Sequence, residues 1–351
     1  MITRSRQSEH CDMRLSDQPF VEVTDLKKHY VVGGGLSVKA IDGVSFAIRE
    51  GEVLGLVGES GSGKSTVARV LMRLTSATSG KVRINQQSVL EIAGRDLQRM
   101  RQTMQLVFQD PFSALDPRMT IGTSMLAPMQ QNGLGTRDML RPRMLQMLEK
   151  VGLDASFADR YPRECSGGQL QRVVIGRALL LNPRFLVCDE PTSALDASMR
   201  TQILNLLMDL KRNLGLTLLM ISHDLRVVNY MCDRIAVMYL GQIVEVADRD
   251  TLFAHPGHPY TRALIASAMI DEAGLDCAVG YLDGDPPSPL KPPAGCRVHT
   301  RCRFATPQCR EEAPQLLEVA PGHSVRCHHW AELDLSSPPA RLPAAHAATM
   351  S

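Results

Sequence analysis

A glycine-rich loop constrains the fold of this chain more than any other segment. The stretch 58–66 reads Gly-Glu-Ser-Gly-Ser-Gly-Lys-Ser-Thr and fits the pattern G-x-x-x-x-G-K-[ST]. It lies between an apolar run, Val53–Val57, that is typical of a buried strand and a helical pattern that begins near Lys64. The alternative, a flexible Gly/Ser turn, does not account for the flanking strand and helix. The segment therefore predicts a strand–loop–helix unit that binds phosphate groups.

The residues of this loop have distinct predicted roles. Glycines let the backbone wrap closely around phosphates, and the N–H groups at the start of the helix point at the anion. Lys64 would hold the β- and γ-phosphates of a nucleoside triphosphate, and the Ser65 hydroxyl would ligate Mg²⁺. The predicted ligand contacts from the loop are Gly58, Ser60, Gly61, Gly63, Lys64, Ser65 and Thr66.

Short apolar runs alternate with helical ones from Phe20 to about Asp248. We expect strands at Val44–Ile48, Val53–Val57, Gln105–Phe108, Phe185–Cys188, Thr217–Ile221 and Arg234–Leu240. We expect helices at Lys64–Leu74, Asp138–Val151, Gly168–Leu180, Ala197–Leu214 and Leu225–Met231. This alternation predicts an α/β fold with a largely parallel sheet wrapped by helices.

Two polar clusters follow predicted strands. Asp189 and Glu190 end the apolar run that starts at Phe185, and His223 follows the next strand along the chain. Carboxyl ends of parallel strands meet at one sheet edge, where ligands of open α/β folds bind. Asp189 suits Mg²⁺ bound through water, Glu190 suits polarisation of an attacking water, and His223 suits a γ-phosphate contact. Each alone is compatible with a purely structural role, and it is their combination with the phosphate loop that predicts chemistry.

A fourth motif, Cys165–Gln169, reads Cys-Ser-Gly-Gly-Gln and opens a predicted helix. It resembles the Leu-Ser-Gly-Gly-Gln signature of ABC (ATP-binding cassette) ATPases, and it lies between the phosphate loop and Asp189, as in that family. The resemblance covers residues 20–250 and rests on six motifs in the family's order. It implies ATP contacts from Tyr30 (adenine stacking), Gln109 (glutamine loop, a Mg²⁺ ligand and catalytic residue), Ser166, Gly168 and Gln169 (signature), Asp196 (D-loop) and His223 (switch histidine).

This resemblance implies an ABC-type P-loop nucleotide-binding domain, with a RecA-like core, an antiparallel β subdomain and a helical subdomain. It also implies an ATPase whose ligands are ATP and Mg²⁺. In that family two cassettes pair head to tail, so that each ATP lies between the phosphate loop of one and the signature of the other. A second helix N-terminus and the Ser166 hydroxyl would then reach the γ-phosphate only in the closed dimer.

Other segments narrow the resemblance to the oligopeptide/dipeptide importers and to the F-type of their two ATPase subunits. They are Val38–Phe46, Leu106–Pro117, Asp189–Asp196 and, beyond the cassette, Leu252–Leu264. This implies a D-type ATPase partner, two membrane-spanning permeases, an extracytoplasmic solute-binding protein and a peripheral position at the cytoplasmic face of the inner membrane. ATP hydrolysis would power import of di- or oligopeptides. Importers of nickel complexes, glutathione or another small solute remain alternatives.

Charge and hydropathy bear on the competing classes. The net charge of +2 predicts no nucleic-acid partner, and no apolar run reaches the roughly 20 residues of a membrane-spanning helix. A non-transport ABC ATPase is a further alternative, but the chain lacks the coiled-coil arms, paired cassettes and basic insertions typical of that class. A binding module without hydrolysis is opposed by the presence of both Glu190 and His223.

The texture of the sequence divides the chain into four parts. We expect an N-terminal tail at 1–19, the ATPase domain at 20–252, a small Cys-containing extension at 253–330 and a disordered tail at 331–351. Within the extension, Asp285–Gly295 is rich in proline and predicts an extended connector without helix or inner strand.

The extension carries four of the nine cysteines, Cys296, Cys302, Cys309 and Cys327. In a reducing compartment such a cluster indicates metal binding more often than disulfides. Structural zinc usually shows C-x₂₋₄-C pairs, which are missing here. The wider spacing resembles the C-terminal region of peptide-importer ATPases that holds a [4Fe–4S] cluster. Zinc, with nearby histidines as ligands, and four unligated thiols remain the alternatives.

Overall fold

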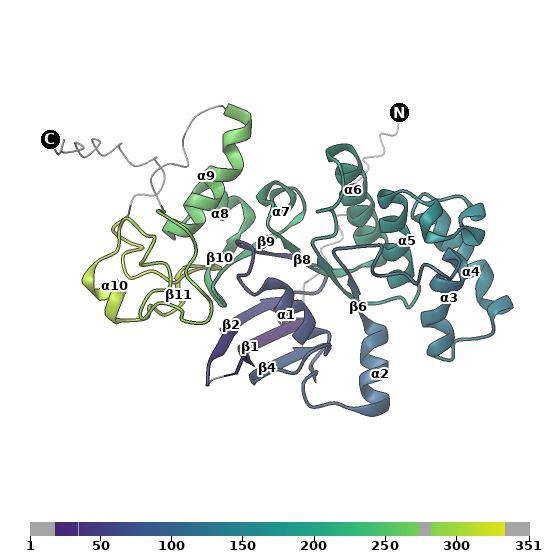
Figure 1. Ribbon diagram of the computed structural model, residues 1–351, viewed down its shortest axis with the longest axis horizontal. Coiled ribbons are helices and arrows are strands. Elements are labelled where there is room, and N and C mark those ends of the chain that lie inside the picture. Colours follow the sequence, from purple (N-terminus) through teal and green to yellow (C-terminus); the bar gives the residue numbers. More distant parts are fainter. Residues whose placement is uncertain (1–17, 34, 274–281, 334–351) are drawn as a thin grey trace, which may run out of the picture.

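The computed structural model describes residues 18–33, 35–273 and 282–333 (Figure 1). Most of the two predicted tails lies outside these ranges, as do Cys11 and Cys277. The described chain forms two sheets and three groups of helices. In Figure 1 a helical group that includes α3, α4 and α5 lies at one end and the Cys-containing extension, with α10 and β11, lies at the other.

The first sheet is antiparallel and is formed by the first part of the cassette. Its strand order is β2-β1-β4-β5. Its strands are β1 (Val21–Val31), β2 (Ser37–Ile48), β4 (Ser79–Ile84) and β5 (Gln87–Ser88). This sheet is the antiparallel β subdomain that the family resemblance implies.

The second sheet has eight strands in the order β11-β12-β10-β9-β3-β8-β7-β6. Neighbours from β9 to β6 pair in parallel, whereas β10, β12 and β11 pair antiparallel. The prediction of a largely parallel sheet therefore holds for its centre. The strands are β3 (Val53–Val57), β6 (Met104–Val107), β7 (Phe185–Asp189), β8 (Thr217–Ser222), β9 (Arg234–Tyr239), β10 (Gln242–Asp248), β11 (Leu317–Ala320) and β12 (His323–Val325).

Helices surround this sheet on both sides. Around the core lie α1 (Lys64–Leu71), α2 (Gly94–Thr103), α6 (Ala197–Leu214) and α7 (Leu225–Met231). The helical group contains α3 (Ile121–Gln131), α4 (Arg137–Lys150), α5 (Gly167–Leu179) and the 3₁₀ turns η1 (Ala155–Asp159) and η2 (Pro162–Glu164). Towards the C-terminus follow α8 (Arg249–Ala254), α9 (Pro259–Ala273) and α10 (Pro307–Glu311).

The central strand β3 shows how the sheet is buried on both faces. Val53 and Val57 pack into the core on the helical side, and Leu54 and Leu56 pack into the core shared with the antiparallel sheet. Alternate side chains of a strand point to opposite faces, so this apolar run is the pattern of a strand covered on both sides. The loop that follows β3 is thereby fixed to the best-buried part of the fold.

The structure confirms the predicted α/β fold, and the sequence placed β3, α6 and α7 at their observed bounds. The connector Asp285–Gly295 contains no helix or strand, as predicted. The boundary expected at residue 252 falls inside α8, and β12 of the extension pairs with β10. The extension thus continues the sheet of the ATPase core.

Candidate functional site

A cleft of about 550 Å³ opens where β3, β7 and β8 end at one edge of the second sheet. The phosphate loop forms its floor, and residues from β2 and from the turn after β9 close one side. Its lining comprises Val38, Lys39, Ala40, Ser60, Gly61, Gly63, Lys64, Ser65, Thr66, Gln109, Glu190, His223, Leu240, Gly241 and Pro289. A cleft of this size is in the range of small-ligand sites.

The phosphate loop needs its glycines for two different reasons. Gly58 and Gly63 have φ angles of 151° and 107°, a region that side chains with a Cβ rarely adopt. A Cβ on Gly58 would also lie 2.0 Å from the Met238 carbonyl oxygen, and one on Gly63 would lie 2.1 Å from that of Ala40. The loop therefore passes so close to β9 and β2 that only glycine fits.

Lys64 is buried and held by the loop that it serves. Its Nζ donates to the carbonyl oxygens of Gly58 (2.8 Å) and Glu59 (2.9 Å) and to Ser62 Oγ (3.3 Å). Burial lowers the pKa of the ammonium group, and the carboxylates of Glu190, Asp189 and Glu59 partly oppose this shift. A cation fixed in this way at the helix start suits an anionic ligand.

Ser65 and Asp189 meet beside Lys64. The Ser65 hydroxyl donates to Asp189 Oδ1 over 3.0 Å, although the two residues come from α1 and the end of β7. Burial raises the pKa of Asp189, and the hydrogen bond from Ser65 acts in the opposite direction. A hydroxyl and a carboxylate oxygen are hard ligands, and hard oxygen ligands are what Mg²⁺ prefers. The donor set therefore fits the predicted magnesium site.

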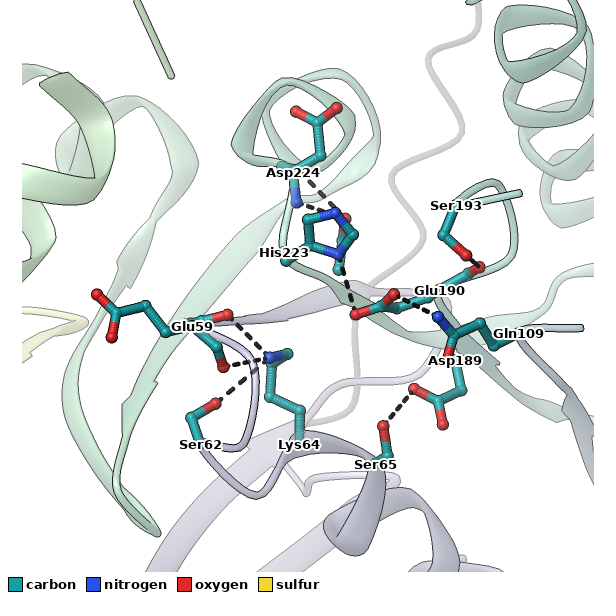
Figure 2. A network of polar contacts seen from close by, with 12 residues as sticks. Glu59, Ser62, Lys64, Ser65, Gln109, Asp189, Glu190, Ser193, His223 and Asp224 are labelled. Carbon is teal, nitrogen blue, oxygen red and sulfur yellow. Dashed lines mark hydrogen bonds and ion pairs between the residues drawn. The ribbon is translucent and has the colours of Figure 1, made fainter. Parts of the chain in front are cut away.

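Glu190 follows Asp189, and two side chains contact its carboxylate (Figure 2). Its Oε1 is 3.0 Å from His223 Nδ1, and its Oε2 accepts a hydrogen bond of 3.0 Å from Gln109 Nε2. The backbone of Glu190 is left-handed, with φ 49°, and its N–H donates to the Ile221 carbonyl oxygen. This bend turns the carboxylate into the cleft, where His223 and Gln109 orient it.

The remaining predicted ATP contacts do not line this cleft. Ser166 is the N-cap of α5 and forms a capping box with Gln169, and Asp196 caps α6 by accepting from the Met199 N–H. Gly168 is buried in the first turn of α5. Tyr30 pairs with Val38 in the antiparallel sheet, and only Val38 reaches the cleft. A single chain therefore brings together the phosphate-loop and carboxyl-edge motifs but leaves the signature elsewhere.

Several lining residues escaped the sequence reasoning. Val38, Lys39 and Ala40 come from β2, Leu240 and Gly241 from the β9–β10 turn, and Pro289 from the proline-rich connector. No motif marks them as ligand contacts. They line the cleft because β9 lies next to β3 and because the connector folds back over the loop.

The four cysteines of the extension gather as the sequence suggested, but no complete metal site forms. Cys296, Cys302, Cys309 and Cys327 all line one small cavity of about 10 Å³, roughly the space of one water. Burial raises the pKa of Cys302 to about 12 and that of Cys327 to about 11. Within the described part of the chain, no three His, Cys, Asp or Glu side chains are arranged to hold a metal ion.

The helices of the described residues were also compared with what a membrane-spanning helix requires. None of the helices found there combines the length and the apolar character needed to cross a bilayer.

Comparison with protein families gives two matches on this chain. The ABC transporter family matches residues 41–193, and the oligopeptide/dipeptide transporter C-terminal region matches residues 244–309. The first match contains the phosphate loop and the signature, and the second contains Cys296, Cys302 and Cys309.

Curated relatives resemble the chain over nearly its whole length. A putative peptide import ATP-binding protein of Brucella ovis is 46% identical, and the match covers 89% of this chain and 98% of the relative. The putative oligopeptide transport ATP-binding protein YkfD of Bacillus subtilis is 47% identical, with 88% and 95% covered. The oligopeptide transport ATP-binding protein AppF of Bacillus subtilis is 42% identical, with 89% and 98% covered.

Solved structures share the fold. The dimeric post-hydrolysis state of the ATP-binding cassette MJ0796, bound to ADP and Pi, has a TM-score of 0.60 and 31% identity and covers 65% of this chain and 98% of its own. CbiO1 from Clostridium perfringens, part of the ABC transporter complex cbiONQ, has a TM-score of 0.60 and 25% identity, with 73% and 96% covered.

Proposed function

Because the chain belongs to the ABC transporter ATP-binding family, in the branch with the oligopeptide/dipeptide transporter C-terminal region, we propose that it is the ATPase subunit of a peptide importer. The observation that carries ATP hydrolysis is the position of Glu190. Its carboxylate lies at the mouth of the phosphate loop between His223 Nδ1 and Gln109 Nε2, each 3.0 Å away. Among the residues that the structure describes, no other carboxylate lines the cleft.

The residues of the cleft divide the reaction between them. The loop N–H groups and Lys64 bind the phosphates and neutralise their charge. Glu190 orients the attacking water and accepts its proton, and His223 contacts the γ-phosphate while fixing the Glu190 carboxylate. Gln109 holds the same carboxylate from the opposite side. Ser65 and Gln109, with Asp189 through a water molecule, would hold a Mg²⁺ ion, which would supply positive charge to offset the negative charge of the phosphates.

The experiment that tests this function is Glu190→Gln in the assembled transporter. The amide keeps the size of the side chain but cannot take a proton, so hydrolysis should fall by about 10²- to 10⁴-fold while ATP binding persists. Glu149→Gln is the matched control. Glu149 is an exposed residue of α4 that does not line the cleft, so this variant should keep the wild-type rate. A wild-type rate in Glu190→Gln would refute this role.

Membership of the family supports a proposal for the partners. We propose that an unlike ATPase of the D-type pairs with this chain, that two permeases and an extracytoplasmic solute-binding protein complete the importer, and that the subunit lies peripherally on the cytoplasmic face of the membrane. Di- or oligopeptides are the solute that the relatives' names support. Nickel complexes, glutathione or another small solute are the alternatives, and transport assays with the assembled complex would distinguish them.

A groove beside the glutamine loop supports the permease contact. It measures about 290 Å³ and is lined mostly by apolar side chains of α1, β6, α3 and α5 and their adjoining loops, among them Leu74, Phe108 and Val174. Phe108 and Phe112 are 41% and 54% exposed. An apolar segment of a permease would cover them, and its movement would reach Gln109 next to Phe108.

For the extension we propose the division at residues 253–330 and a [4Fe–4S] cluster on Cys296, Cys302, Cys309 and Cys327, with zinc as the alternative. Four soft thiol ligands around one cavity support it. Because the free space is that of about one water, binding of a cluster would require the cavity to widen. The role would be structural. Anaerobic purification with iron, sulfide and zinc analysis tests it, and metal-free protein would refute both forms.

A further inference from the structure

The extension reaches the phosphate loop through an arginine. Arg301 Nη1 lies 3.0 Å from Glu59 Oε2 and 3.1 Å from Oε1, although 242 positions separate the two residues. The Arg301 side chain is 11% exposed and that of Glu59 is 28% exposed. Figure 2 shows the Glu59 carboxylate pointing away from Lys64 and from the catalytic carboxylates. The side chain of Glu59, the second residue of the phosphate loop, therefore points to the extension and away from the cleft.

The main chain of Glu59 is held by the same part of the molecule. Its N–H donates to the hydroxyl of Tyr260, on α9, over 2.9 Å. Tyr260 is fully buried and packs on Tyr239 with ring centroids 4.7 Å apart. Arg301 also donates to the Tyr239 hydroxyl, so one arginine, two tyrosines and Glu59 form a single connected group.

A second arginine braces the other side of the loop. Arg297 is 7% exposed, and it hydrogen-bonds to the Leu240 carbonyl oxygen and forms an ion pair with Asp42. The next residue, Gly241, donates its N–H to the Ser62 carbonyl oxygen of the phosphate loop over 2.8 Å. Arg297 thus fixes the turn that carries the backbone contact to Ser62.

These two contacts bracket the part of the loop that faces the ligand. Ser60 and Gly61 line the cleft and lie between the two braced residues, Glu59 and Ser62. Lys64 also donates to the Glu59 carbonyl oxygen and to Ser62 Oγ, so the same two residues set the position of the phosphate-binding ammonium group. Any shift of either brace would change the curve of the loop and the place of Lys64 together.

We propose that Arg301 and Arg297 are positioning residues for ATP, and that the C-terminal extension is a working part of the nucleotide site. The extension holds the phosphate loop in the conformation that binds the phosphates. A loop fixed before binding loses less conformational freedom when ATP arrives, and this favours binding. This inference rests on the proposed ATPase function and adds to it the source of ATP affinity. Neither arginine touches the ligand cleft itself.

Arg301→Gln tests the proposal, and Arg303→Gln is its matched control. Arg303 lies two residues further and also contacts both oxygens of a carboxylate, that of Asp283, through Nε and Nη2, and none of its described contacts reaches the loop. In the assembled transporter, Arg301→Gln should raise KM for ATP by about tenfold, a loss of about 1.4 kcal/mol in binding, with little change in kcat. Arg303→Gln should leave both constants at wild-type values.

A double-mutant cycle separates loop positioning from general damage. Glu59→Gln removes the loop side of the pair, so combining it with Arg301→Gln should raise KM no further than either change alone. Arg301→Lys should restore part of the affinity, because it keeps the charge beside Glu59 but loses the hydrogen bond from Nε to the Gly284 carbonyl oxygen. Additive effects, an unchanged KM in Arg301→Gln, or an equal loss in Arg303→Gln would each overturn the proposal.

Two further readouts keep the outcomes distinct. If Arg301→Gln does not fold, Glu59→Gln carries the test alone, since Glu59 is on the loop, and an unchanged KM there overturns the inference. If the wild-type complex and Arg303→Gln both hydrolyse ATP while Arg301→Gln matches them, the inference fails and the ATPase function stands. A wild-type complex with no ATPase activity would overturn both.

Discussion

At the scale of single residues, Gly58 is the most constrained position of the site. It joins the buried strand β3 to the phosphate loop with φ 151°, a region that is essentially confined to glycine. The Met238 carbonyl oxygen lies where a Cβ would be placed, only 2.0 Å away. Because the clash is with backbone, it cannot be relieved by rotating a side chain.

We therefore expect Gly58→Ala to destabilise the fold by about 3 kcal/mol or more. The control is Gly133→Ala: Gly133 has a left-handed φ of 68°, but apart from its chain neighbours no described residue has an atom within 4 Å of the added Cβ. That change should cost only about 1 kcal/mol, since it carries the conformational penalty without the clash. Urea unfolding of the two purified variants measures the difference, and equal losses would show that the close approach to Met238 does not matter.

At the scale of elements, the junction between β10, β12 and the start of α9 is built around a buried carboxylate. Glu245 is fully buried on β10 and accepts from the N–H groups of Gly257 (2.6 Å) and His258 (3.0 Å). His323 of β12 lies 2.7 Å away through Nε2. Three donors satisfy the carboxylate, so the extension is fastened to the ATPase core by hydrogen bonds as well as by strand pairing.

The same junction makes stability depend on pH. Burial lowers the pKa of His258 from 6.5 to about 3, and its Nδ1 accepts from the Tyr260 N–H, as only a neutral ring can. Below pH 6.5 His258 binds a proton in the unfolded chain but stays neutral in the folded chain. Stability should therefore fall by about 2.5 kcal/mol between pH 7 and pH 4.5 from this group alone.

His258→Asn should remove that part of the acid sensitivity. The amide oxygen can still accept from the Tyr260 N–H, but the side chain does not titrate. Urea unfolding at both pH values should show a smaller loss in the variant than in wild type, whatever its stability at pH 7. His255→Asn, at an exposed site after α8, is the control and should keep the wild-type difference. An unchanged pH dependence in His258→Asn would contradict this origin.

Secondary-structure elements were predicted best where the pattern of apolar residues continued without interruption from one end of the element to the other. Val53–Val57 is apolar throughout and is β3, and α6 starts at a capping Asp196 and ends at Gly215 in a left-handed conformation. β1 was missed, because charged and polar residues such as Lys27 and Lys28 interrupt its alternation on a sheet that is exposed on one face. β11 and β12 are short and depend on pairing with β10, which no local pattern reveals.

At the scale of the whole molecule, the motifs of the site could be predicted from the sequence, but the residues that hold the phosphate loop in place could not. Parallel strands bring Lys64, Asp189, Glu190 and His223 to one edge, so spacing and strand order suffice for them. The contacts of Arg301 with Glu59 and of Pro289 with the cleft join distant parts of the chain without any motif. They become visible only when the extension is seen folded against the loop.

The position of the signature supports the proposed pairing with a second cassette. Ser166 is exposed at the N-terminus of α5, in the helical group at the end of the molecule opposite the extension (Figure 1). It is absent from the lining of the chain's own cleft. A helix N-terminus with a free approach suits a phosphate brought by a second cassette. The proposed head-to-tail pairing with an unlike ATPase would place Ser166 at the partner's ATP.

Ser166→Ala should therefore leave ATP binding to the isolated chain unchanged and slow hydrolysis in the assembled importer. Loss of one such donor costs about 10²-fold at the site that it completes, so the total rate should fall by about half if the two sites act independently and further if they are coupled. The change also removes the N-cap of α5, at about 1 kcal/mol. Asp154→Ala, which removes the cap of η1, controls for that loss and should keep the wild-type rate. A weaker affinity of the isolated Ser166→Ala chain for ATP would contradict action on the partner's nucleotide, because the side chain would then serve its own cleft.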